Sequence, residues 1–130
     1  MVDLEHARAL LERARADLAA LRGMRDPAIF ADEVFGFQAQ QAAEKAIKAW
    51  ISAQGLAYPK THDIDALLAI LSLGGVNSSP FAILGELNPF AVQYRYEGLD
   101  SAEEPVDRSL WLQRVDVLLV HVAKSLAAIG

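Results

Sequence analysis

Two lysines in the stretch Phe37–Trp50 are the first candidates for chemistry. Lys45 and Lys48 are three residues apart, a spacing that places two side chains on one face of a helix, so their ammonium groups could jointly hold a phosphate. Glu44 lies four residues before Lys48, and an ordinary surface ion pair between them is the alternative. Ala residues recur through the same stretch, which predicts that a neighbouring helix packs closely against it.

The segment Lys60-Thr61-His62-Asp63 is a second candidate site, because it precedes a predicted helix. The N–H groups and partial positive charge of a helix N-terminus favour anions, and Lys60 adds a further positive charge. His62 could act as acid, base or phosphate donor; alternatively, its ring bonds a backbone carbonyl or Asp63 and fixes the loop. No second His or carboxylate cluster has the spacing of metal ligands around it, so we expect neither a metal nor a cofactor.

A third candidate is Tyr94-Arg95-Tyr96, an arginine between two aromatic residues at an expected helix end. Arg95 could clamp a phosphate with two hydrogen bonds, and either tyrosine could stack on a base. Alternatively, Tyr94 and Tyr96 are core aromatics and Arg95 pairs with an acid. The three segments together give a candidate set for binding a nucleotide or a partner: Lys45, Lys48, Lys60, His62, Tyr94, Arg95 and Tyr96.

The elements that must position these residues are helical. Ala and Leu occupy 41 of the 130 positions, and both cost little in a helix, so the chain is predicted to be all-α. Hydrophobic spacing and caps predict helices from Asp3 to Gly23, from about Ile29 to Gln54, from His62 or Asp63 to about Leu73, at 80–87 and 89–95 around Asn88-Pro89, and from near Asp107 to the C-terminus. Residues 97–106 are predicted to form an acidic loop. Four long helices and a short kinked one suggest an up-and-down four-helix bundle.

Length and composition bound the class of protein. Residues 1–130 are expected to form a single domain, and a hydrophobic content of 53% suggests apolar surface buried in an oligomer. A net charge of −5 argues against a protein that coats DNA. The chain has no cysteine, and it shows neither a long apolar run nor the features of a signal peptide, so we expect a cytoplasmic protein without a membrane span.

The motifs, taken in order, resemble the HEPN family of prokaryotic all-helical domains, which are commonly encoded beside a minimal nucleotidyltransferase. The resemblance covers roughly residues 4–128 and rests on three stretches: Phe37-x-Ala-Gln-Gln41-Ala-Ala-Glu44-Lys45-Ala-x-Lys48-Ala, Pro59-Lys60-Thr61-His62-Asp63-Ile64-x-x-Leu67-Leu68, and Tyr94-Arg95-Tyr96. It implies a four-helix bundle with a short extra helix, usually a homodimer, that acts in nucleotide or nucleic-acid biology and often in a toxin–antitoxin pair. The leading hypothesis is therefore a HEPN-domain partner or nucleotide-binding module of a nucleotidyltransferase, and not itself an enzyme.

The resemblance also offers an alternative, a metal-independent ribonuclease that acts as an RNA-cleaving toxin. Active HEPN proteins resemble one another in an Arg followed after four to six residues by a His, and Arg114-x6-His121 matches this spacing. Seven residues of helix separate the two by about 10 Å, so a two-fold dimer would be needed to gather both pairs in one cleft. In that cleft His121 would act as acid or base and Arg114 would stabilise the phosphate. The other reading makes His121 a helix-packing residue and pairs Arg114 with an acid.

Two features depart from the active pattern. Val115 follows Arg114 where active members tend to carry a polar residue. Val122 and Ala123 follow His121, so the tyrosine that some HEPN toxins offer to a nucleotidyltransferase for modification is absent from that position.

Overall fold

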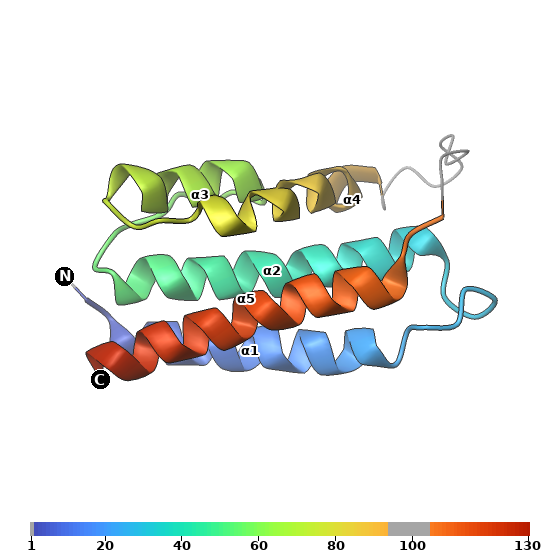
Figure 1. The fold of residues 1–130 in the computed structure, drawn as a ribbon, viewed down its shortest axis with the longest axis horizontal. Helices are drawn as coiled ribbons and strands as arrows, with labels where there is room; N and C mark the ends of the chain where they lie inside the picture. The colour runs from blue at the N-terminus through green and yellow to red at the C-terminus, as the bar shows by residue number, and fades with distance from the viewer. Residues whose placement is uncertain (1, 94–104) are drawn as a thin grey trace.

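The computed structural model describes residues 2–93 and 105–130, and these residues form a helical bundle in which successive long elements run in opposite directions (Figure 1). The described elements are α1 (Leu4–Arg22), α2 (Asp32–Ala53), α3 (Ile64–Leu73), the 3₁₀ helix η1 (Ser79–Leu87), α4 (Asn88–Gln93) and α5 (Arg108–Ile129). The described part of the chain contains no strand. The predicted all-α, up-and-down bundle is confirmed.

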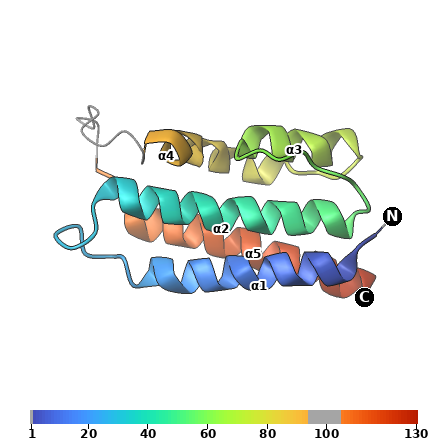
Figure 2. The same ribbon diagram turned by 180° about the vertical axis from the view of Figure 1, so that it is seen from behind.

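Helix α2 lies at the centre of the molecule. It contacts α1 and α5 on one side and α3, η1 and α4 on the other, as the two opposite views show (Figures 1 and 2). Its alanines are fully buried against these neighbours, namely Ala39, Ala42, Ala43, Ala46 and Ala49. The predicted close helix packing is confirmed. Because the Ala-rich face is used inside the subunit, it is not available as a surface for another subunit.

Aspartate side chains cap the N-termini of three of the helices. The carboxylate of Asp3 accepts a hydrogen bond from the His6 N–H at 3.0 Å, and Asp63 and Asp107 cap α3 and α5 in the same way. Helix α2 instead begins at Asp32, later than the predicted start near Ile29. The reason is a turn at Asp26, whose side chain accepts a hydrogen bond from the Ala28 N–H at 2.9 Å. This turn keeps residues 27–30 outside the helix.

Three short helices, α3, η1 and α4, together take the place of the fourth long helix of the bundle. The predicted break at Asn88-Pro89 is present, but the piece before it is a 3₁₀ helix, and Asn88 is the first residue of α4. The Asn88 side chain accepts from the Ile64 N–H at 2.8 Å and donates to Asp63 at 2.9 Å, which ties the start of α4 to the start of α3. Residues 94 and 95 of the predicted helix 89–95, and residues 97–104 of the predicted acidic loop, lie outside the described residues.

One buried arginine fastens the first connection to the last helix. The Arg108 guanidinium is 8% exposed; it donates to the carbonyl oxygens of Met24 at 2.7 Å and Phe30 at 2.6 Å and to the Asp32 carboxylate at 2.8 Å. These bonds satisfy the backbone of the connection between α1 and α2.

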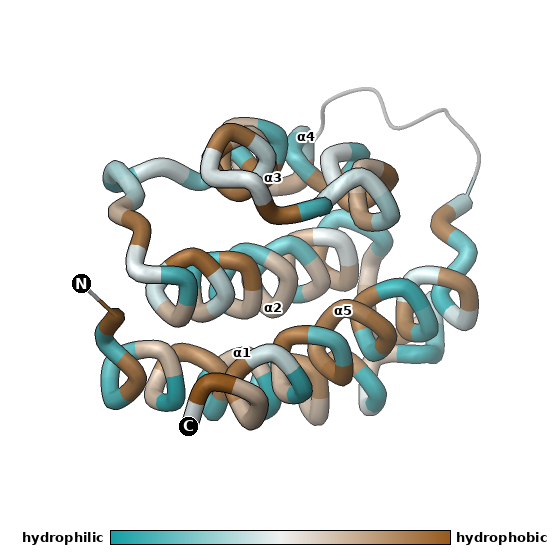
Figure 3. The backbone as a smooth tube through the Cα atoms, turned by 60° about the vertical axis from the view of Figure 1, so that its left-hand side comes forward, coloured by the Kyte–Doolittle hydropathy of each residue, from teal (hydrophilic) through white to brown (hydrophobic). Residues whose placement is uncertain are grey.

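Hydrophobic and hydrophilic residues alternate along α1 and α5, as expected of helices that each bury one face (Figure 3). The central helix α2 is covered on two sides and has no exposed residue. Among the described residues, no helix is both long and apolar enough to cross a bilayer.

Candidate functional site

A buried carboxylate on α2 organises the first polar cluster. Glu44 is 4% exposed and accepts three hydrogen bonds, from Lys48 Nζ at 2.8 Å, His62 Nδ1 at 2.9 Å and Gln40 Nε2 at 2.9 Å. We call these four residues the Glu44 cluster. The Lys48 ammonium also lies 5.4 Å from the centre of the Tyr58 ring, so the cluster fixes the connection between α2 and α3.

The charge state of Glu44 follows from these contacts. Burial alone would raise the pKa of this carboxyl, but hydrogen bonds from Lys48, His62 and Gln40, with the lysine's positive charge, outweigh burial and lower the pKa from its ordinary value of 4.5. The carboxylate is therefore ionised at neutral pH, and it compensates a lysine side chain that is only 14% exposed. The predicted Glu44–Lys48 ion pair is present, but it is largely buried and is not the surface pair that was expected.

His62 is the member of the cluster that reaches solvent. Its side chain is 64% exposed, while Nδ1 is held by Glu44 and its backbone oxygen accepts from Gln40 Nε2 at 3.0 Å. Neither predicted partner of the ring, a backbone carbonyl or Asp63, is the one observed. With Nδ1 engaged, Nε2 is the ring nitrogen left to meet a ligand.

The start of α3 differs from the expected anion site. Asp63 accepts from the Ala66 N–H at 3.2 Å, Asn88 accepts from the Ile64 N–H at 2.8 Å, and the Asp63 N–H donates to the Thr61 hydroxyl at 3.1 Å. Two N–H groups of the first turn of α3, those of Ile64 and Ala66, are thus taken, and Asp63 adds negative charge there. Lys60 is exposed beside this helix start.

Lys45 and Lys48 are not brought together. Lys45 Nζ lies 2.6 Å from Asp17 Oδ2 on α1, whereas Lys48 turns to Glu44. Gln38 also donates to the Asp17 carbonyl at 2.9 Å, so this pair of contacts joins α2 to α1. Each ammonium group is compensated by its own carboxylate, and the two do not form a joint phosphate clamp. Tyr94, Arg95 and Tyr96 lie outside the described residues.

A second group of predicted site residues lies on α5. The Arg114 guanidinium stands 4.6 Å from the centre of the Trp111 ring, and in the described part of the chain it has no acidic partner. The predicted pairing of Arg114 with an acid is therefore wrong for these residues. The His121 ring is exposed at its edge but packs on Trp50 at 4.8 Å and Phe81 at 5.1 Å between ring centroids.

Exposed hydrophobic side chains surround Arg114 and His121. We define the α5–η1 surface by these two residues and by three aliphatic ones with their exposures: Ile83 38%, Leu110 37% and Val117 52%. A hollow of 230 Å³ lies between η1 and α5 at this surface, with Arg114 at its wall. The arrangement offers one guanidinium and one imidazole in apolar surroundings, a setting in which charge on a phosphate is recognised strongly.

Sequence reasoning missed three residues that shape these sites. Gln40 completes the Glu44 cluster, and its position one helical turn before Glu44 was the available signal. Trp50 and Phe81 support His121, but they come from α2 and η1, and nothing local in the sequence links them to α5. In residues 2–93 and 105–130, no group of three His, Asp or Glu side chains is placed to hold a metal ion.

Comparison with known proteins gives one match. The sequence profile of the HEPN domain matches residues 7–115, which is most of the chain. No curated protein and no solved structure matches the chain.

Proposed function

The chain belongs to the HEPN domain family, and on this premise we propose that it works as a homodimeric binding subunit beside a nucleotidyltransferase. The observation that carries the proposal is the α5–η1 surface. Val117, at the middle of α5, is 52% exposed there, although most apolar side chains of the long helices are buried in the core. A ridge of exposed aliphatic side chains on one helix is typical of a surface that another subunit covers.

The spacing on α5 supports a two-fold contact. When two copies of a helix cross antiparallel about a two-fold axis, residues at equal distances from the axis face each other. An axis passing near Val117 would place Arg114 of one subunit opposite the partner subunit's His121, and the reverse pair on the other side. Each contact would then put one guanidinium and one imidazole on the same rim of the dimer.

The ligand chemistry we propose is a phosphate, carried by a nucleotide or by RNA. Arg114 has no acidic partner among the described residues, and a guanidinium in that state binds a phosphate with two parallel hydrogen bonds. Lys45 and Lys48 are already compensated by carboxylates, so they support binding only by holding the fold. Lys60 and His62, both exposed, stay candidates for contacts with the nucleotidyltransferase or its nucleotide, together with Tyr94, Arg95 and Tyr96. We propose that the chain and this nucleotidyltransferase form a toxin–antitoxin pair.

Measurement of the mass in solution tests the homodimer. Light scattering after gel filtration should give twice the chain mass of 14.1 kDa. Val117→Asp should give the monomer mass, because the variant places a charge at the proposed axis. Val92→Asp changes another valine, 57% exposed, away from α5 and should leave the dimer intact. A monomeric wild type, or a Val117→Asp dimer, would refute the proposed interface.

The role beside a nucleotidyltransferase is tested separately. The chain is co-expressed with a nucleotidyltransferase encoded next to it, and the mass of the co-purified complex is measured. A stable complex supports the proposal; absence of any neighbouring nucleotidyltransferase, or failure of the two chains to associate, counts against it.

The accessible Arg114 and His121 favour one alternative function, a metal-independent ribonuclease. In that reading His121 serves as acid or base and Arg114 stabilises the charge on the phosphorus in the composite cleft of the dimer. Purified protein should then cut structured RNA in the presence of EDTA, and His121→Ala should abolish cutting while His6→Ala, another exposed histidine, should not. Intact RNA at high concentrations of wild-type protein would rule the alternative out.

A further inference from the structure

A groove between α1 and α5 carries a charge opposite to that of the whole chain. Its two adjoining hollows, of 410 Å³ and 390 Å³, share Arg15 and Ala123 in their lining and so form one continuous feature. Four basic residues line it against two acidic ones: Arg8, Arg15, Arg22 and Lys124 against Glu12 and Asp116. The chain as a whole has a net charge of −5, so this is a local concentration of positive charge.

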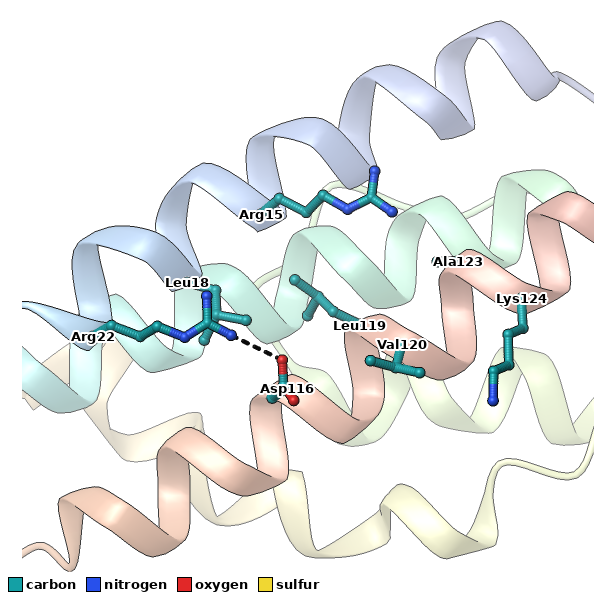
Figure 4. Close-up of a pocket in the computed structure, with 8 residues that line it drawn as sticks. All are labelled: Arg15, Leu18, Arg22, Asp116, Leu119, Val120, Ala123 and Lys124. Carbon is teal, nitrogen blue, oxygen red and sulfur yellow. Dashed lines mark hydrogen bonds and ion pairs between the residues drawn. The ribbon is translucent and has the colours of Figure 1, made fainter.

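The basic side chains stand on both walls of the groove. Figure 4 shows Arg15 and Arg22 projecting from α1, and Lys124 on α5, with the Arg22–Asp116 ion pair bridging the two helices at one end of the hollow. Arg15 is paired only loosely, at 3.4 Å from Glu12 on its own helix, and both of those side chains are more than half exposed. Among the described residues Arg8 and Lys124 have no acidic partner, so the groove keeps uncompensated positive charge.

The floor of the groove is aliphatic, and small side chains line its α5 side. Leu11, Leu18 and Leu119 form the floor and are at most 4% exposed, whereas Val120 is 46% exposed at the rim. Small side chains at Ala123 and Ala127 allow another backbone to approach α5 closely. A ligand here would gain a modest apolar contact, and most of its recognition would come from charge.

Three arginines of α1 recur every seven residues, the interval that is typical of two helices packed side by side. Arg8, Arg15 and Arg22 are seven residues apart, so they follow one line along α1 at intervals of about 10.5 Å. Seven residues is also the repeat at which side chains of one helix return to the same neighbours on a second helix packed alongside. Acidic residues at that repeat on a docked helix would therefore meet the arginines in register.

We infer that the α1–α5 groove is a docking surface for an acidic amphipathic helix of a partner protein. The helix lies along the groove with a narrow apolar stripe against Val120 and Ala123. Asp or Glu residues on both sides of that stripe face Arg8 and Arg15 on one wall and Lys124 on the other. This inference does not depend on the proposed homodimer or on phosphate binding.

Two other occupants fit the groove less well. An RNA strand would find no aromatic side chain among the lining residues on which a base could stack. A second copy of the chain, related by a two-fold axis through this groove, would set the arginines of α1 against the same arginines. Like charges in contact oppose that arrangement.

Fluorescence anisotropy on the full chain tests the inference. The probe is a fluorescein-labelled helical peptide of about 21 residues, three heptads, with a Leu and Ala stripe flanked on both sides by Glu. It should bind wild-type protein at about 50 mM salt and weaken as salt rises, because the pairs are exposed to solvent. The double variant Arg15→Glu/Lys124→Glu should weaken binding by about tenfold or more at low salt.

A charge-matched variant separates docking from general attraction. Arg13→Glu/Arg25→Glu changes the net charge equally, but neither residue lines the groove, so its affinity should stay within about twofold of wild type. A scrambled peptide of the same composition should bind more weakly than the amphipathic one. Gel filtration should give the same mass for both double variants and wild type, which keeps this result apart from the homodimer.

The inference is overturned by any of three results. These are no binding of the amphipathic peptide at low salt, equal weakening by the groove variant and the charge-matched variant, and displacement of the peptide by a single-stranded RNA of similar length at lower concentration. The last result would assign the groove to nucleic acid.

Discussion

The Glu44 cluster and the α5–η1 surface both bring together a basic residue and a histidine, yet they treat them in opposite ways. In the cluster, Lys48 and His62 both donate to one buried carboxylate. On α5, Arg114 and His121 rest on aromatic rings, and in the described residues no carboxylate compensates them. Similar residue types therefore serve stability at one place and stay available for a ligand at the other.

The difference follows from burial. A carboxylate taken out of water needs partners that offset its lost hydration, and Glu44 finds three of them on α2 and at the start of α3. A guanidinium at the surface keeps its hydration, so packing on a ring suffices to orient it. If this interpretation is right, substitutions in the cluster should change stability, and substitutions on the α5–η1 surface should change binding.

The largest effect should come from removing the buried carboxylate. Glu44→Ala removes one of the hydrogen bonds of the Gln40 amide and leaves Lys48 with an uncompensated charge, and it should lower the free energy of unfolding by about 3 kcal/mol. Urea denaturation followed by circular dichroism measures this. Glu12→Ala removes an exposed carboxylate whose side chain is 67% exposed and should cost less than about 0.5 kcal/mol. Equal losses in the two variants would remove the distinction.

Lowering the pH should also reduce the free energy of unfolding, by less than Glu44→Ala does. The pKa of Glu44 is lower in the folded chain than its ordinary value of 4.5, so the stability it contributes is fully present above pH 4.5 and is lost as pH falls through the lower folded-state pKa. Glu44→Gln has no such group, and the difference in unfolding free energy between it and wild type should shrink below pH 4.5. A difference that stays constant with pH would contradict the lowered pKa.

The exposed edge of the cluster should matter less than its centre. His62→Ala removes one of three hydrogen bonds to Glu44, and because the ring is 64% exposed the loss should be about 1 kcal/mol. The same urea experiment measures it. A loss as large as that of Glu44→Ala would mean that His62 belongs to the structural centre, and no loss would leave it as a ligand-binding residue alone.

The sequence predicts the elements of this fold better than its contacts. Local signals sufficed for the cap Asp3, and for the helix at 64–73 they left Thr61 and Asp63 as alternatives, of which Asp63 is the cap. They failed where a partner comes from elsewhere in the chain. Asp17 holds Lys45 from 28 residues away, and Glu44 holds His62 from 18. Helical spacing indicated the partner of Lys48, which is Glu44, but it could not indicate the partner of Lys45.

The same limit applies to α5. The sequence identifies Arg114 and His121 and their shared helix face, but the rings that hold His121, Trp50 and Phe81, come from other helices. Arg114 instead rests on Trp111 of its own helix. The sequence alone left open whether the two side chains were packed inside or paired with acids.

The smallest effect on stability should come from the α5–η1 surface, and it sharpens the comparison most. Arg114→Ala removes a partly exposed side chain whose charge has no acidic partner among the described residues and which lies over the Trp111 ring, so the unfolding free energy should change by less than about 0.5 kcal/mol. Its affinity for a single-stranded RNA or a nucleoside triphosphate should nevertheless fall, by about tenfold if the guanidinium binds phosphate with two hydrogen bonds. Arg13→Ala, which removes an exposed charge that belongs to none of these sites, provides the control for general attraction. A large loss of stability with unchanged affinity would make Arg114 a structural residue like Glu44, and the two regions would then no longer differ in kind.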